Sequence, residues 1–152
     1  MYNIMGQAEA IFRGMAIEVP AGQKLYGVMP GDTVRVKAAV DYRGPALDDN
    51  FYAAIGEWRG VTWPTDIGYF DEHWDSGLIP VHFDLSYNWV TYFLQADIDI
   101  TALTEFPWTP GWFDLYAKLN VAREFTPRLD NIIEVLLAGE FDKFTITSYD
   151  KV

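Results

Sequence analysis

Apolar and polar residues alternate along much of the chain with a period of two, which is typical of a β-strand with one buried face. Residues 113–121 follow this pattern most clearly, because five apolar residues alternate there with polar or aromatic ones. The same alternation marks the segments 34–40, 51–55, 79–85 and 92–100. Shorter strands are expected at 16–19, 25–28 and 144–147. About nine or ten short strands without intervening helices predict an all-β chain folded as an antiparallel β-sandwich.

Glycine and proline mark the turns between these segments. Pro30 and Gly31 precede the first long alternating stretch, and Gly44 and Pro45 follow it. Another proline-glycine pair, at positions 110–111, precedes residues 113–121. Proline presets φ for a turn and glycine tolerates positive φ, so these positions are expected to separate strands.

Residues 126–141 fit two interpretations. Their apolar side chains recur at helical spacing, and Thr126, Pro127 and Gly139 could begin and end a helix. However, Ile133 and Val135 also belong to an alternating pattern typical of a strand. We favour the strand, because an isolated helix would need a groove of its own against a sandwich.

The composition narrows the functional classes. Half of the 152 residues are apolar, which argues against intrinsic disorder and indicates a single domain spanning residues 1–152. The formal net charge of −11 disfavours nucleic acid and anionic membranes, because binding to either needs lysine and arginine. The absence of cysteine excludes disulfides and thiolate metal sites.

We recognise no signal peptide or membrane-spanning segment, and therefore expect a soluble protein without membrane insertion.

Two stretches carry a family resemblance. Residues 28–36, with their proline-glycine-aspartate turn, and residues 109–117 resemble bacterial immunoglobulin-like modules of the CARDB adhesion type. Residues 130–135 are similar to the last strand of such modules. The resemblance implies an immunoglobulin-like β-sandwich that mediates contacts rather than an activity. The chain departs from the immunoglobulin pattern at Phe113 and Leu115, where a corner tyrosine and a cysteine would stand.

Aromatic residues concentrate between positions 58 and 93, and several stand beside turn or charged residues, which favours their exposure. Exposed rings stack on sugars and anchor protein interfaces, whereas buried rings would pack in the core or beneath the connection at 60–78. The candidate binding residues are Trp58, Trp63, Tyr69, Trp74, Trp108 and Trp112.

Carboxylates gather in the same part of the chain. Calcium binds several oxygen ligands, so a calcium-type site could form from Asp66, Asp71, Glu72 and Asp75. Their spacing matches no EF-hand loop, and solvated surface charge is the default interpretation. The two histidines, at positions 73 and 82, lack the spacing of a zinc site. We therefore expect no cofactor, with calcium as the alternative.

The chain contains no nucleophile elbow, phosphate-binding loop or zinc-protease motif, which favours a binder over an enzyme. We expect a non-catalytic interaction or structural module that binds protein, as a homo-oligomer or in a larger assembly. A virion accessory protein or an extracellular assembly subunit would suit this description. Residues 1–23 and 139–152 could form peripheral strands or pair with another molecule, because a sandwich must protect its edges. The alternative is a carbohydrate-binding module that stacks a glycan on exposed tryptophans.

The negative charge is concentrated in one part of the sequence. Between Arg59 and Lys118 the chain has nine acidic residues and neither lysine nor arginine. The same region holds most of the candidate aromatic residues, so we expect any functional surface to be both acidic and aromatic. Such a surface suits a basic protein patch, a cation or a neutral glycan.

Overall fold

The computed structural model describes residues 4–12, 15–20, 22–62, 67–104, 107, 111–137 and 141–152. These residues form eleven strands and no helix, which confirms an all-β fold with slightly more strands than the roughly nine or ten expected. No helix in these ranges is long and apolar enough to cross a membrane. The strands are β1 (Ile4–Phe12), β2 (Met15–Val19), β3 (Leu25–Val28), β4 (Thr33–Gly44), β5 (Leu47–Thr62), β6 (Ile67–Asp75), β7 (Ile79–Phe83), β8 (Ser86–Asp99), β9 (Trp112–Leu119), β10 (Glu124–Phe125) and β11 (Leu129–Val135).

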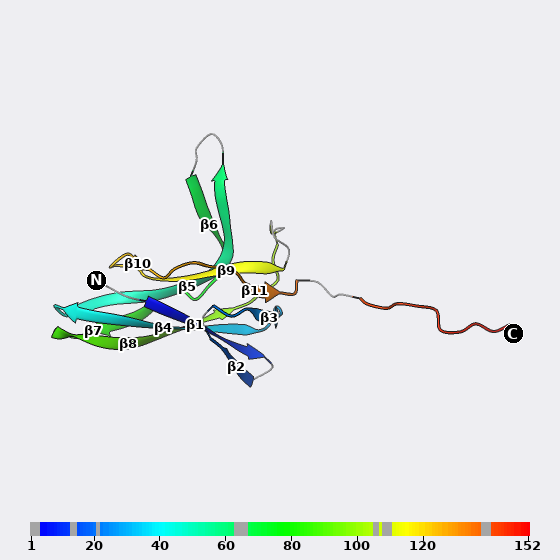
Figure 1. Ribbon diagram of the computed structural model, residues 1–152, viewed down its shortest axis with the longest axis horizontal. Helices are drawn as coiled ribbons and strands as arrows, with labels where there is room; N and C mark the ends of the chain where they lie inside the picture. The colour runs from blue at the N-terminus through cyan, green and yellow to red at the C-terminus, as the bar shows by residue number, and fades with distance from the viewer. Residues whose placement is uncertain are drawn as a thin grey trace.

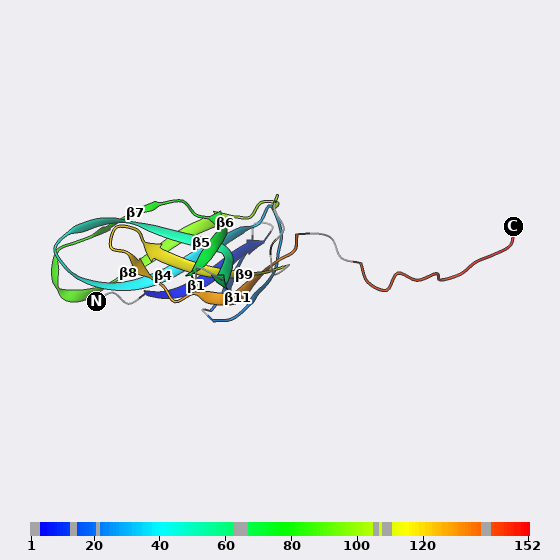
Figure 2. The same cartoon turned by 90° about the horizontal axis from the view of Figure 1, so that it is seen from above.

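The strands form two sheets that pack face to face as a sandwich (Figures 1 and 2). The small sheet has the order β2-β1-β4-β8 and is antiparallel throughout. The large sheet has the order β3-β11-β9-β5-β6, with β10 beside β9 and β7 beside β5. Its pairs are antiparallel except for β3 and β11, which run parallel.

The core lies between the two sheets and consists of the inward residues of the alternating stretches. On β4 every second residue from Val34 to Val40 is buried, and β8 buries Leu94, Ala96 and Ile98 in the same way. On β9 the inward side chains begin with Phe113, which is fully buried. These strands were predicted from the alternation, because one face must leave water while the other stays solvated.

Residues 129–135 form a strand, as favoured from the sequence, rather than a helix. β11 lies between β9 and β3, and Ile133 and Val135 are fully buried. The strand is stabilised here because both neighbours offer backbone partners, which a helix could not use.

The connection expected at residues 60–78 is instead a hairpin. β5 continues to Thr62 and pairs with β6, and Figure 1 shows this hairpin rising away from the sandwich. The prediction of a long connection was wrong, because most of this segment belongs to two strands that pair with each other.

The two ends of the chain behave differently. β1 pairs with β4 from Ile4 to Ile11 and with β2 on its other side, so it is an inner strand of the small sheet rather than a peripheral one. The strand expected at 144–147 is absent, since residues 141–152 have no regular structure and extend away from the sandwich (Figures 1 and 2). Alternation alone does not make a strand when no neighbour pairs with it.

Candidate functional site

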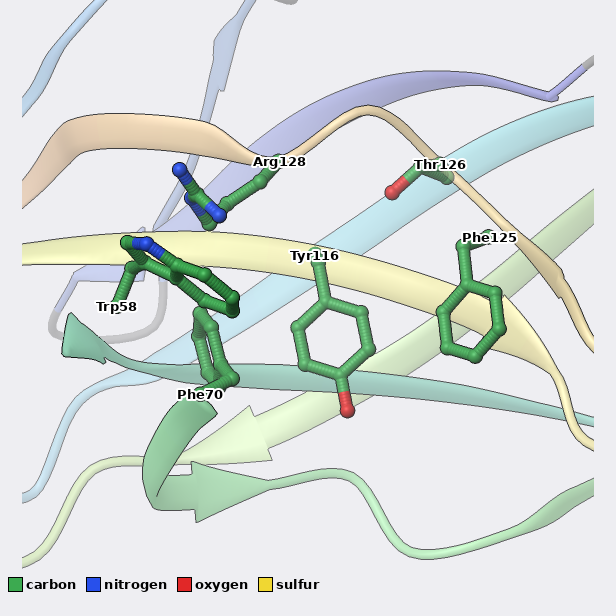
Figure 3. Close-up of a pocket in the computed structure, with 6 residues that line it drawn as sticks. All are labelled: Trp58, Phe70, Tyr116, Phe125, Thr126 and Arg128. Atoms are coloured by element: carbon green, nitrogen blue, oxygen red, sulfur yellow. The ribbon is translucent and has the colours of Figure 1, made fainter. Parts of the chain in front are cut away.

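An aromatic groove lies on the outer face of the large sheet, with a cavity volume of about 250 Å³ (Figure 3). Strands β5, β6, β9 and β10 and the segment that leads into β11 each contribute to it. We call it the aromatic groove, and it is lined by Trp58, Phe70, Tyr116, Phe125, Thr126 and Arg128.

Strand geometry places these rings on one face. β9 buries Leu115 and Ala117, so Tyr116 between them must point outward. In the same way Trp58 follows a buried residue of β5, and it lies directly opposite Phe70 of β6. The groove therefore follows from the register of three neighbouring strands.

The rings contact one another along the groove. Phe70 meets Tyr116 edge to face, with ring centroids 4.7 Å apart. Tyr116 and Phe125 lie nearly parallel at 6.3 Å, and Figure 3 shows them side by side. The guanidinium of Arg128 lies 4.3 Å from the centre of the Trp58 ring, a cation–π geometry that covers one face of the indole.

A single carboxylate fixes two of the tyrosines. Glu72 of β6 accepts hydrogen bonds from the hydroxyls of Tyr52 and Tyr116. Burial, followed by this hydrogen bonding and the charge of Glu72, raises the pKa of both phenols above their usual value. Tyr116 is therefore held as a neutral donor with its ring oriented along the groove.

A second, more polar cleft of about 220 Å³ adjoins the groove and shares Trp58 and Arg128 with it. In this cleft Arg128 pairs with Asp130. Asp114, largely buried, accepts hydrogen bonds of 2.7 Å from the backbone N–H groups of Trp58 and Asn131. Asp114 thus ties β5, β9 and β11 together beneath the cleft.

The structure places the predicted aromatic residues in different surroundings. Trp58 lies in the groove, and Tyr69 of β6 is exposed. Trp112 is half-buried between Lys24, 4.7 Å from its ring centre, and the edge of Tyr26. Trp63 and Trp108 lie outside the described residues.

Trp74 is buried, so the prediction that it is exposed was wrong. Its ring packs against Phe113 at 5.0 Å, and its indole N–H donates to the carbonyl of Thr101. A register shift near Gly56 makes His73 an extra residue in β6, and this turns Trp74 toward the core. The polar residues on either side of Trp74 in the sequence give no indication of that shift.

The carboxylates proposed for calcium do not converge in the described part of the chain. Asp71 pairs with Arg59, Glu72 holds the two tyrosines, and Asp75 accepts a hydrogen bond from the backbone of Gly77. Asp66 lies outside the described residues. Among the described residues these three acids are not gathered as metal ligands, although Asp75 acts electrostatically on the same two tyrosines as Glu72. The four-residue calcium site, which includes Asp66, stays a prediction.

A different polar cluster lies on the β5–β6 hairpin. Ligand atoms of Glu57, Asp71 and His73 lie within 4.8 Å of one another, as a metal ion would require. However, a guanidinium nitrogen of Arg59 lies 2.6 Å from Asp71 and 3.6 Å from Glu57. Although burial lowers the pKa of Arg59, its hydrogen bond to Asp71 raises that pKa overall. The cluster thus already contains a positive charge where a cation would bind.

Sequence reasoning missed several lining residues. The alternation predicts that Tyr116 points outward, but nothing in the sequence indicates a role for it or for Arg128. Phe125 lies on the short β10, for which the sequence offers no alternation. The only usable signal was that Tyr116 and Trp58 occupy outward positions of predicted strands.

Comparisons of this chain with protein-family models, curated proteins and solved structures found no match.

Proposed function

We propose that this protein is a non-catalytic interaction module that binds a protein partner through the aromatic groove. The observation that carries the proposal is the combination of Trp58, Tyr116 and Arg128 in one open groove. These are the three residue types that dominate the binding energy of protein interfaces. Their orientation is set by Glu72 and the neighbouring strands, so little conformational entropy is lost on binding.

The charge around the groove indicates the chemistry of the partner. Glu72 lies beside the tyrosines, in the stretch between residues 60 and 117 that has no lysine, and Asp130 pairs with Arg128 at the other end of the groove. A partner that offers an apolar or aromatic anchor flanked by basic residues would fill the groove and pair with these acids.

Affinity isolation from an extract that contains the natural partners tests this proposal. The bait is the full chain, compared with a Tyr116→Ala/Phe125→Ala variant and with Tyr87→Ala, an exposed ring on β8 outside the groove. We expect the same protein partner with the wild-type and Tyr87→Ala baits and its loss with the groove variant. Equal recovery with all three baits would contradict the proposal.

A carbohydrate platform is the second candidate. The nearly parallel rings of Tyr116 and Phe125 favour it, because flat neighbouring rings can stack on a sugar. Against it, cations already cover a face of both Trp58 and Trp112. Titration of tryptophan fluorescence with a panel of polysaccharides separates the two functions, since a saturable change abolished by Tyr116→Ala would favour the glycan.

An acidic β-sandwich with aromatic contact surfaces would suit a virion accessory protein or an extracellular assembly subunit, and an immunoglobulin-like module of the CARDB type would suit either. Neighbouring genes for tails or capsids would favour the virion, and polysaccharide-degrading genes would favour sugar binding.

A further inference from the structure

The small sheet ends in a long strand with one free side. β8 (Ser86–Asp99) is the last strand in the order β2-β1-β4-β8, and among the described residues it pairs only with β4. At 14 residues it is the longest strand at an edge of either sheet, compared with 9 for β6, 5 for β2 and 4 for β3. A free edge of this length carries a row of backbone groups able to pair with another strand.

This edge lacks the usual protection against added strands. Residues 86–96 contain no charged residue and no proline, and they expose Tyr87, Trp89 and Phe93 on their outer face. Asp97 and Asp99, farther along, are engaged by Arg35 and Thr33 of β4. By contrast, the edge strand β6 carries three acidic residues. Charged residues, short length and proline are how natural sheets block edge pairing.

The same chain carries an exposed segment whose residues alternate like those of a strand. Residues 141–152 extend from the sandwich, and the side chains of Phe144 and Ile146 are 97% and 88% exposed (Figures 1 and 2). As a strand, residues 144–149 would place these two side chains on one face and Thr145, Thr147 and Tyr149 on the other. Threonine, isoleucine and aromatic residues are favoured in strands.

We propose that residues 144–149 of one chain add to the free edge of β8 in a second copy as an extra strand. Phe144 and Ile146 then extend the inner face beside Leu94 and Ala96, while Tyr149 joins the outer aromatic side chains of β8. Backbone groups on both strands gain hydrogen-bond partners, and the alternating side chains set the register.

Charge explains why a second copy is a suitable partner. Two chains that each carry −11 repel one another, so their contact must avoid acidic surfaces. Residues 86–96 are uncharged, and residues 141–152 hold two aspartates and two lysines, which cancel. Donor and acceptor are thus neutral segments of an acidic molecule. The contact uses no residue of the aromatic groove, so it is independent of the proposed function.

Disulfide trapping tests the contact directly, because the chain has no cysteine of its own. Thr147→Cys chains are mixed under mild oxidation with chains that carry Cys at one position of the outer face of β8, either Thr91→Cys or Gln95→Cys. We expect a cross-linked heterodimer with at least one acceptor, since paired strands bring Cβ atoms within bonding range. The matched control is Tyr26→Cys, an exposed position on edge strand β3, which should yield none.

Analytical ultracentrifugation supplies the second measurement. The wild-type chain should sediment as a dimer or larger, and Phe144→Lys/Ile146→Lys should weaken self-association by about tenfold or more. The exposure of both side chains means that this variant keeps the melting temperature of the sandwich. A wild-type monomer at every concentration, or undiminished association of the variant, would overturn the proposal. Cross-linking only within single chains of a Thr147→Cys/Gln95→Cys double variant would also overturn it.

Discussion

Gly56 illustrates how one missing side chain permits the β5–β6 hairpin. A Cβ atom at this position would lie 2.0 Å from the backbone carbonyl oxygen of Asp71 on the neighbouring strand. Because that oxygen is backbone, β6 itself would have to move. Gly68 has a related role beside the groove, where a Cβ would lie 2.4 Å from the Trp58 ring.

We therefore expect Gly56→Ala to lower the free energy of unfolding by about 3 kcal/mol. Gly60→Ala is the matched control, because nothing lies within 4 Å of its Cβ position, and it should change stability by less than about 0.5 kcal/mol. Chemical denaturation followed by tryptophan fluorescence gives both values. Equal stability of the two variants would show that β6 adjusts without cost.

His82 provides a pH-dependent contact at the residue scale. Its Nδ1 lies 2.6 Å from Asp48 and its Nε2 lies 3.2 Å from Asp84. The hydrogen bond to Asp48 raises the pKa of His82 and outweighs desolvation, which lowers it. The stabilisation is therefore present at low pH and is lost as the pH rises through the raised pKa.

Asp48→Asn should move the pKa of His82 back toward about 6.5. NMR titration of the imidazole ring in both proteins measures this shift. The variant should also be less stable than the wild type at pH 5.5 to 6, with no difference near about pH 9, where the histidine is neutral in both. An unchanged His82 titration would refute the pairing.

At the scale of elements, Asp49 connects the start of β5 to the turn after β9. This buried carboxylate accepts hydrogen bonds from the backbone N–H groups of Val121, Ala122 and Asn50. The turn contains Arg123 at a φ of 54°, a conformation that is costly without outside support. Asp49 thus fixes the turn that leads into β10 and the groove residue Phe125.

Asp49→Ala should cost about 3 kcal/mol, because it leaves buried backbone donors without an acceptor. Hydrogen exchange at Val121 and Ala122 should speed up more than exchange in the centre of β4. Asp48→Ala, at the exposed neighbouring position, is the control for charge removal and should cost far less. Similar losses for both variants would contradict this role.

At the scale of the whole molecule, the net charge of −11 opposes compaction. Salt shortens the Debye length from about 30 Å at 0.01 M to about 8 Å at 0.15 M, which screens this repulsion. We expect the melting temperature at pH 7 to rise by about 3 °C over that range of sodium chloride. Near the isoelectric point of about 4.4 the net charge vanishes, so the same salt should have little effect. A salt-independent melt at pH 7 would contradict the prediction.

Much of the fold could be predicted because alternation is a local signal. Val34 to Val40 and the outward position of Tyr116 both follow from the two-residue period of a strand. Trp74 could not be placed, because its direction depends on a bulge that pairing with β5 creates. Phe144 and Ile146 alternate like strand residues, yet no strand in the described part of the chain pairs with them. The aromatic groove was predicted only in part, because it depends on which strands pair with one another.

By itself, the sequence determined the all-β class, the inward face of each long strand and the coincidence of acidic and aromatic residues. These properties depend on residues close together in the chain. Only the tertiary structure decided which strands are neighbours, and therefore that Trp58, Phe70 and Tyr116 line one groove. It also decided that Trp74 lies in the core and that β8, among the described residues, pairs along one side only. Strand pairing joins residues far apart in sequence, and no local pattern records its register.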